Sequence, residues 1–582
     1  MRCLTKPVGA RACVQGCFFV NKTIQWKEVL HEGMIAFDVG ENMSKHKQAK
    51  KSFLIQGSIL AGAGILTKII GFIYRIPMSN LLGDRGNGVY TVAFGIYNIA
   101  LTLSSYSMPL AVSKLVAARL AKGEKQNAKR VFRDAFFFAV FMGLLACLAL
   151  YFGADLLEGL YKRQGLSKPL RILAPTTLVV ALLGAFRGYF QGHHNMVPTA
   201  VSQVLEQIMN AIVSVVASYG FIKLYAGSDM VYAYGAAGGT MGTLMGAMIA
   251  LVYFVILYLV TRQDDMGTED TEEALEEHKL IYKAIIFTML PVILSQTIYQ
   301  IGYTIDDILY GNICALKRVP EEIASSLQGV FNTQYNQMIN LPVAISTAMA
   351  SSTIPSMVAS KTRGETGELH EKITMVLKLN MLIAFPCMVG MTILSTPIIK
   401  LLFFKLTTYQ TVASNLLLFG SSAIVFYALS SITTAILQGN DYMKLPLKHS
   451  AVSLVVHIAL LSGLLYFTDL SVYALVIANV TFPLVVCVLN CVQIARKVGY
   501  RFELMNLFGK PLLASLLMGV FTYVIYEGLF RVGMPMLVAT AVSIVVSMGV
   551  YFAFVIKLGL ITKEEMKQLP GGRTLAAKIY KN

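Results

Sequence analysis

The feature that most constrains this chain is a series of fourteen apolar stretches that carry few or no charges. An α-helix of about 20 residues is long enough to cross the hydrocarbon core of a membrane. The stretches do not alternate apolar and polar residues, as the strands of a membrane barrel would. They lie near 53–74, 88–112, 135–154, 172–192, 197–222, 231–260, 280–305, 327–354, 373–399, 412–438, 447–468, 472–495, 511–530 and 535–556. We therefore predict an all-α integral membrane protein with about 14 transmembrane helices.

Composition agrees with a membrane protein and argues against other classes. The 582 residues are 55% hydrophobic and 14% charged, whereas soluble domains contain about 25% charged residues. We interpret the formal net charge of +17 as an orientation signal and an attraction to anionic lipid, and we expect no binding of nucleic acid. The sequence lacks a Gly-rich phosphate loop with Lys-Ser/Thr and the H-E-x-x-H and G-x-S-x-G motifs. We expect neither an enzyme nor a bound cofactor.

The distribution of basic residues predicts how the chain is oriented in the membrane. With the N-terminus inside, the inner segments carry 29 Lys and Arg residues and the outer segments carry 12. Lys and Arg are retained on the cytoplasmic side. We therefore expect a multi-pass protein of a bacterial plasma membrane with both termini in the cytoplasm. Residues 1–42 lack the apolar core of a signal peptide, and Met43 looks like the more natural start.

Two sets of matching motifs, about 240 residues apart, indicate an internal repeat. Tyr97–Glu124 and Tyr335–Glu365 both begin with Tyr-Asn, contain a proline and end in a basic loop with Gly-Glu. The motifs QGHHNMVP and QGNDYMKLP follow in the same order. Six spans separate the starts of the two units, so both enter from the same side as parallel repeats. Two six-helix lobes of this kind are typical of carriers that bind substrate between the lobes and work by alternating access.

The repeat defines the predicted organisation of the chain. The acidic stretch between the lobes is interpreted as a solvated linker. The predicted parts are a disordered cytoplasmic extension (1–51), an N-lobe (52–260), an acidic cytoplasmic linker (261–279), a C-lobe (280–500), helices 13 and 14 (501–558) and a cytoplasmic basic tail (559–582).

Charged residues in and directly after the first span are candidates for the binding site, although a position of Arg75 near the outer interface is an alternative. A charge at the bilayer centre costs about 2.5–3.5 kcal/mol on insertion scales, so it needs water, a partner or a ligand. Lys68 and Arg75 are seven residues apart and share a helix face. We favour a cavity-lining role over a Lys68 side chain that reaches the membrane surface. Asp84 and Arg85 follow in a predicted loop, where an ordinary turn salt bridge is the alternative.

The fourth and fifth spans carry a second charged group. Arg187 and Gln191 lie one turn apart on the fourth span, and Glu206 lies on the fifth. Two interpretations stay open. Arg187 and Glu206 either contact a ligand or form an ion pair that joins two adjacent antiparallel helices.

The second half is lined differently, by amides and carboxylates. Polar residues recur at helical spacing in the spans 280–305 and 327–354, and Asn340 continues the second stripe. They suit a wet cavity, although hydrogen bonds between helices would also explain the asparagines. Asp306 and Asp307 either line the cavity, bind a coupling cation (sodium or a proton), or are simply exposed near the outer end. The predicted substrate-binding residues are Lys68, Arg75, Arg187, Gln191, Glu206, Gln296, Gln300, Asp307, Asn332 and Asn336.

Residues 51–116, with the motif GFIYRIP, and the later motif FRGYFQG resemble the SpoVB/MurJ-type proteins of the MOP (multidrug/oligosaccharidyl-lipid/polysaccharide) exporter superfamily. The resemblance extends over about 43–560. It implies fourteen helices in two lobes and the flipping of lipid II, the undecaprenyl-pyrophosphate-linked peptidoglycan precursor. It also implies a basic central cavity for the pyrophosphate, where Lys68 lies at the corresponding position and Arg75 lies close to another.

The resemblance also sets the expected partners and the alternatives. We expect a monomer that contacts its lipid substrate and the bilayer, with cell-wall synthesis proteins as further candidate partners. One alternative is a flippase for another undecaprenyl-linked oligosaccharide. A second is a cation-coupled multidrug exporter of the same superfamily, and a third is a nontransporting scaffold for cell-wall or spore assembly.

Overall fold

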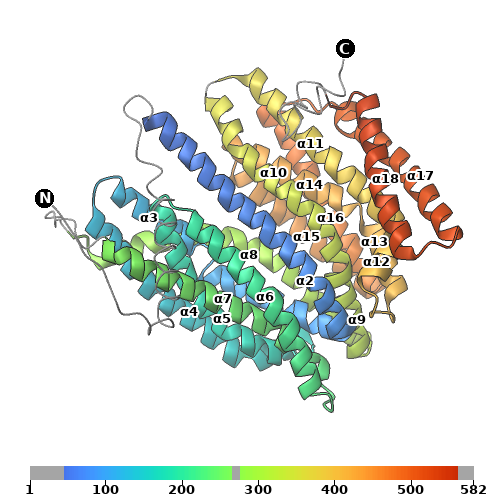
Figure 1. The fold of residues 1–582 in the computed structure, drawn as a ribbon, viewed down its shortest axis with the longest axis horizontal. Coiled ribbons are helices and arrows are strands. Elements are labelled where there is room, and N and C mark those ends of the chain that lie inside the picture. Colours follow the sequence, from blue (N-terminus) through green and yellow to red (C-terminus); the bar gives the residue numbers. More distant parts are fainter. Residues whose placement is uncertain (1–44, 265–274, 363, 562–582) are drawn as a thin grey trace, which may run out of the picture. The chain divides into compact units, whose positions relative to one another are not determined.

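The computed structural model describes residues 45–264, 275–362 and 364–561, and the secondary structure in these ranges is helical throughout (Figure 1). Contacts divide the chain into two units, Met1–Ser58 and Ile59–Asn582. Of the first unit, the structure describes residues 45–58, which begin helix α2. The predicted extension up to residue 44 and the tail from 562 lie outside the described residues. All packing discussed below belongs to the second unit.

The described helices follow the predicted apolar stretches in order. The first half contains α2 (Lys45–Ser104), α3 (Met108–Leu120), α4 (Lys125–Tyr161), α5 (Ser167–Gly192), α6 (Val197–Leu224) and α7 (Val231–Asp264). The second half contains α8 (His278–Leu316), α9 (Glu321–Gly329), the π-helix η2 (Val330–Tyr335), α10 (Asn336–Thr362), α11 (Thr366–Ile393), α12 (Ser395–Leu402), α13 (Gln410–Gly420), α14 (Ala423–Gly439), α15 (Lys444–Phe467), α16 (Val472–Gln493), η3 (Ile494–Val498), η4 (Met505–Gly509), α17 (Lys510–Arg531) and α18 (Met536–Lys557).

The apolar length of these helices confirms an all-α membrane protein. Within the described residues, ten helices are long and apolar enough to cross a membrane. The bent pair α13 and α14, which meet at 45°, adds an eleventh if it forms one span. One of the ten, Gly62–Leu120, covers two of the predicted stretches. Each predicted stretch coincides with helix apart from short breaks, and the count of fourteen spans stays a prediction.

Helix α2 changes direction at a single residue. Gly83 has φ 70° and ψ 171° inside the otherwise continuous helix, a backbone conformation that glycine adopts at little cost because it has no Cβ. The side-chain amide of Asn87 donates to the Ser79 carbonyl oxygen at 2.9 Å and bridges the kink. The predicted loop at this position is therefore reduced to one residue.

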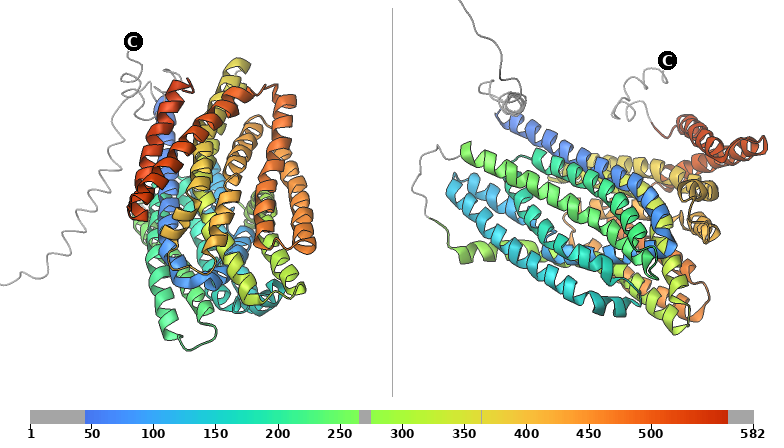
Figure 2. Two further views of the ribbon diagram at one scale, coloured as in Figure 1. Left: turned by 90° about the vertical axis from the view of Figure 1, so that its right-hand side faces the viewer. Right: turned by 60° about the horizontal axis from the view of Figure 1, so that its bottom comes forward.

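The buried apolar residues group largely by sequence half. One core cluster is drawn from residues 310–507 and two others from residues 78–289. Helix α8 contributes to both sets, because Ile281 and Ile285 pack in a first-half cluster and Tyr310 packs in the second-half cluster. Helices α17 and α18, red in Figures 1 and 2, lie side by side, and α17 packs on α11. The exact limits of the two lobes stay predictions.

Candidate functional site

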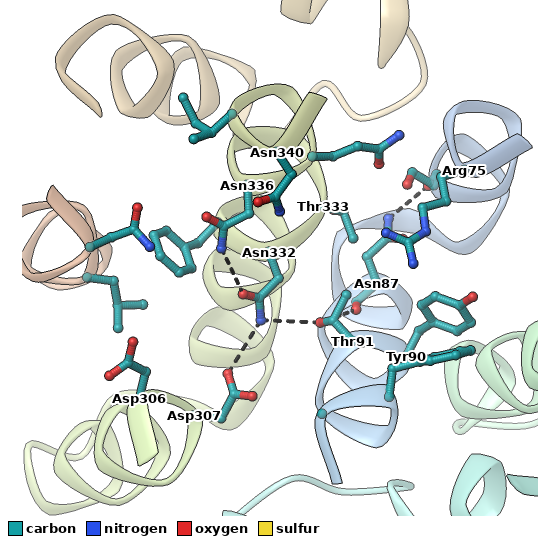
Figure 3. Close-up of a pocket in the computed structure, with 18 of the residues that line it drawn as sticks. Arg75, Asn87, Tyr90, Thr91, Asp306, Asp307, Asn332, Thr333, Asn336 and Asn340 are labelled. Carbon is teal, nitrogen blue, oxygen red and sulfur yellow. Dashed lines mark hydrogen bonds between the residues drawn. The ribbon is translucent and has the colours of Figure 1, made fainter. Parts of the chain in front are cut away.

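A cavity of about 250 Å³ lies among helices from both halves of the sequence (Figure 3). Both arms of the kinked α2 form one side, and α8, η2, α10, α14 and α16 form the other. The polar lining consists of Arg75, Ser79, Asn87, Tyr90, Thr91, Asn98, Asp306, Asp307, Asn332, Thr333, Asn336, Gln337, Asn340, Tyr427 and Asn479.

The predicted asparagine stripe faces this cavity. Asn332 lies in the π-helix η2, and such segments occur frequently at functional sites. Its amide nitrogen lies 3.3 Å from Thr91 Oγ1 and 3.4 Å from Asp307 Oδ1, in position to donate to both (Figure 3). The Asn336 amide donates to Asn332 Oδ1 at 3.4 Å. Asn332 therefore connects α2, α8 and α10 across the cavity.

Arg75 supplies the basic group of the cavity. Its side chain extends from α2 into the cavity and ends near Asn87 and Tyr90 (Figure 3), and it is exposed. Among the described residues, no carboxylate forms an ion pair with Arg75. It is also the single Lys or Arg in the lining. Its guanidinium interacts with the neighbouring Tyr74, and in the described part of the chain no carboxylate neutralises its charge.

Two carboxylates make the lining mixed in charge. Asp307 Oδ1 accepts hydrogen bonds from the Gln328 and Asn332 amides, and Asp306 Oδ1 contacts His457. Both carboxylates, which the sequence placed among the candidate lining residues, therefore lie in the same cavity as the basic Arg75. Within the described part of the chain, no group of three or more His, Cys, Asp or Glu residues could hold a metal ion. Neither Asp306 nor Asp307 is identified as a metal ligand, and the coupling cation stays a prediction.

Lys68 does not share the cavity with Arg75. Its side chain is exposed, and it is absent from the lining. Seven residues along an α-helix amount to about 10 Å along the axis. Lys68 and Arg75 therefore share a face of α2, but only Arg75 lines the cavity.

Arg187 and Glu206 form the ion pair that was one of the two interpretations. Arg187 Nη2 lies 2.7 Å from Glu206 Oε2, and Arg187 Nε lies 3.3 Å from Ser202 Oγ. The Gln191 amide lies 3.3 Å from Thr199 Oγ1 on the same neighbouring helix. All these contacts join α5 to α6, and none of the residues lines the cavity. A role in ligand binding stays a prediction.

The remaining predicted residues lie on α8. Gln296 and Gln300 fall within this helix, but their side chains are outside the described residues.

The region around the kink is joined to the second half by close contacts. Arg85 Nη2 lies 2.7 Å from Glu321 Oε2 on α9, and Asp84 Oδ1 accepts from the Gln334 amide at 2.9 Å. Asp84 and Arg85 therefore contact the second half of the chain, and the described residues do not show the turn salt bridge that was the alternative. Near these pairs the α2 backbone at Gly88 touches α9.

Apart from Arg75, the residues of α2 that line the cavity were not predicted. Asn87, Thr91 and Asn98 follow one another at intervals of four and seven residues, which places them on one face of a helix. This spacing, which begins just before the apolar stretch 88–112 and continues into it, is the signal that would have identified them.

Comparison with known proteins gives a family match over more than half of the chain. The family model described as "Polysaccharide biosynthesis protein" matches residues 54–361. Three proteins of Bacillus subtilis (strain 168) are similar over nearly their whole length. They are the uncharacterized membrane protein YabM (26% identity, 90% of this chain and 97% of the relative), lipid II flippase MurJ (24%, 89% and 98%) and stage V sporulation protein B (22%, 90% and 98%).

Two solved structures share the fold. A structure of lipid II flippase MurJ in an inward closed conformation gives a TM-score of 0.59 at 17% identity, covering 84% of this chain and 98% of the other. An inward-facing multidrug resistance MATE family transporter of the MOP superfamily gives 0.56 at 15% identity, covering 74% and 98%. At these identities the structural matches establish the fold.

Proposed function

This chain belongs to the polysaccharide biosynthesis protein family, and we propose that it is a flippase that moves lipid II across the bacterial plasma membrane. The proposal rests on one observation above all. Arg75, without a carboxylate partner among the described residues, faces a cavity lined mainly by amides and hydroxyls, with Asp306 and Asp307 as its two carboxylates. Lipid II flippase MurJ of B. subtilis is among the similar proteins, which favours this substrate.

The chemistry of the lining suits such a head group. A pyrophosphate is anionic, and a guanidinium forms charge-assisted, bidentate hydrogen bonds with phosphate oxygens. The asparagines offer both donors and acceptors for sugar hydroxyls and peptide groups. The lipid tail would remain among the membrane-facing helices, whose outer surfaces carry many exposed apolar side chains.

We propose that the two halves rock against each other and open the cavity to each side in turn. In the structure, Arg85 and Glu321 join the halves near the α2 kink. The distribution of Lys and Arg supports placing both termini in the cytoplasm, so the kink would face outward. One chain supplies both sides of the cavity, and we propose that it acts as a monomer.

A second function is favoured by a different observation. Asp307 lines the cavity, and the hydrogen bonds to it come from the uncharged Gln328 and Asn332 amides. A carboxylate in such a position would suit an organic cation. Export of cationic drugs is therefore the alternative function.

Complementation separates the two functions. The chain is expressed in a bacterium depleted of its own lipid II flippase, and growth is compared with efflux of ethidium, an organic cation. We expect growth without ethidium efflux. Arg75→Gln should abolish rescue, whereas Lys68→Gln, a change outside the cavity lining, should preserve it at equal membrane abundance. Efflux without growth would establish the alternative.

A further inference from the structure

A histidine and a carboxylate meet in the wall of the cavity. His457 Nε2 on α15 lies 2.6 Å from Asp306 Oδ1 on α8. His457 Nδ1 lies 2.9 Å from the Ala478 carbonyl oxygen on α16. The two side chains are 5% and 13% exposed. Asp306 lines the cavity, whereas His457 is not among the lining residues.

The two contacts determine how many protons the pair holds. A carbonyl oxygen can only accept, so Nδ1 of His457 must carry a hydrogen. If Nε2 and the carboxylate oxygen both lacked a hydrogen, two lone pairs would face each other at 2.6 Å. A second proton therefore lies between them, on the imidazole or on the carboxyl group. In either form the pair is neutral overall.

The surroundings leave Asp306 dependent on this histidine. In the described part of the chain, no Lys or Arg forms an ion pair with Asp306. Arg163 is directed elsewhere, because it donates to Gln328, which in turn donates to Asp307. The titratable groups nearby on α8 are Asp307 and Tyr310. On α14, Tyr427 contacts Asn479, the residue next to Ala478. On α15, His449 lies about two turns before His457 and contacts Asn490. Helix α16 adds the Ala478 carbonyl and the Phe482 ring.

We propose that His457 and Asp306 form a proton-binding site in the cavity wall. The site holds a proton while α8 and α15 are packed together, and it exchanges that proton with cavity water when the two helices separate. Its use in transport rests on the proposed function and makes the proton the coupling ion.

The charge of the site explains how a proton and an anionic head group would be linked. The loaded pair is neutral, but loss of the proton leaves a net negative charge in the wall beside Asp307. That charge repels an anion in the cavity. An anion that binds better to the loaded form must in turn increase proton occupancy, because coupling between two bound species is reciprocal. The proton and the head group would therefore bind together.

Nuclear magnetic resonance of the full chain tests the site without any transport. The chain is labelled with ¹⁵N-histidine and placed in nanodiscs of phosphatidylethanolamine and phosphatidylglycerol at neutral pH. We expect one ring with hydrogen on both nitrogens, or with one hydrogen shared with a carboxyl group. His457→Gln should remove this signal, and Asp306→Asn should convert it to that of a ring with one hydrogen. His449, a buried histidine on the same helix with an amide partner, should keep its signals.

Two results would overturn the proposal. One is a wild-type His457 ring with a single hydrogen whose Nε2 shares no hydrogen with Asp306, and the other is a His457 spectrum unchanged by Asp306→Asn. A lipid II transport assay in proteoliposomes under an imposed pH gradient separates this proposal from the proposed function. Coupling is supported if wild-type transport depends on the pH gradient and transport by His457→Gln does not. Wild-type transport that is independent of the gradient refutes coupling. A chain that moves no lipid but shows the shared proton supports the site and refutes the proposed function.

Discussion

The backbone of α2 at Gly88 runs so close to α9 that a Cβ at this position would overlap the Ser325 carbonyl oxygen. The obstacle is backbone, which cannot rotate away as a flexible side chain would. We predict that Gly88→Ala forces the two helices apart and lowers stability by about 1–3 kcal/mol, as overpacking typically does. Unfolding in SDS measures the change.

The matched control is Gly153→Ala on α4, where a Cβ would meet nothing within 4 Å. Alanine is a better helix former than glycine, so this substitution should be neutral or stabilise by up to about 1 kcal/mol. Equal effects of the two substitutions would show that the close contact between Gly88 and Ser325 does not exist in the membrane.

The ion pair between Arg85 and Glu321 should contribute modestly to the contact between the halves. The side chains are 23% and 21% exposed, so solvent screens part of the attraction. A double-mutant cycle of Arg85→Gln and Glu321→Gln should give a coupling of about 0.5–1 kcal/mol. Arg85 also lies over the Tyr232 ring at 3.9 Å, so its single substitution should cost more than that of Glu321. Zero coupling in SDS unfolding would contradict the pair.

Arg187 and Glu206 allow the structural and ligand-binding interpretations to be separated. Removing one partner leaves an uncompensated charge, which we expect to cost up to about 3 kcal/mol, since the side chains are only 15% and 27% exposed. The double variant Arg187→Gln, Glu206→Gln leaves no charge and should recover both stability and growth rescue. If the double variant is stable but as inactive as either single variant, Arg187 and Glu206 instead bind the ligand.

Asn332 should matter more for stability than Asn340, the last asparagine of the stripe. Asn332→Leu removes the amide that contacts Thr91 and Asp307. The Asp307 carboxylate then has fewer hydrogen-bond donors. We expect a loss of about 1–3 kcal/mol. Asn340→Leu is the control, because Asn340 lines the same cavity and is exposed. Equal losses in thermal unfolding would mean that the Asn332 contacts contribute nothing.

The sequence was sufficient for the class of fold, because bilayer thickness dictates how long an apolar helix must be. The resemblance of residues 51–116 to SpoVB/MurJ-type proteins is confirmed by the similarity to lipid II flippase MurJ and stage V sporulation protein B, and the polysaccharide biosynthesis family model matches over 54–361. The pairing of Arg187 with Glu206 could also be foreseen, since neighbouring antiparallel spans bring such positions together.

Long-range partners could not be predicted in the same way. Arg85 and Glu321 are 236 residues apart, and helical periodicity does not indicate how distant helices face each other. The asparagine stripe reached the cavity as predicted, but Lys68 did not, because a shared helix face does not determine depth. Asp306 was foreseen as a lining residue, whereas its partner His457 lies in an apolar span with no local signal of the contact.

The central claim is that this protein moves a pyrophosphate-linked lipid across the bilayer, and that Arg75 in the cavity wall binds the pyrophosphate. The most direct measurement is the exposure of lipid II on the far leaflet of proteoliposomes that contain the purified chain. Wild type and Lys68→Gln should expose lipid II at similar rates, and Arg75→Gln should reduce the rate at least about tenfold, as expected for the loss of about 1.4 kcal/mol of interaction. Equal rates for wild type and Arg75→Gln, or no exposure by the wild-type chain, would contradict the claim.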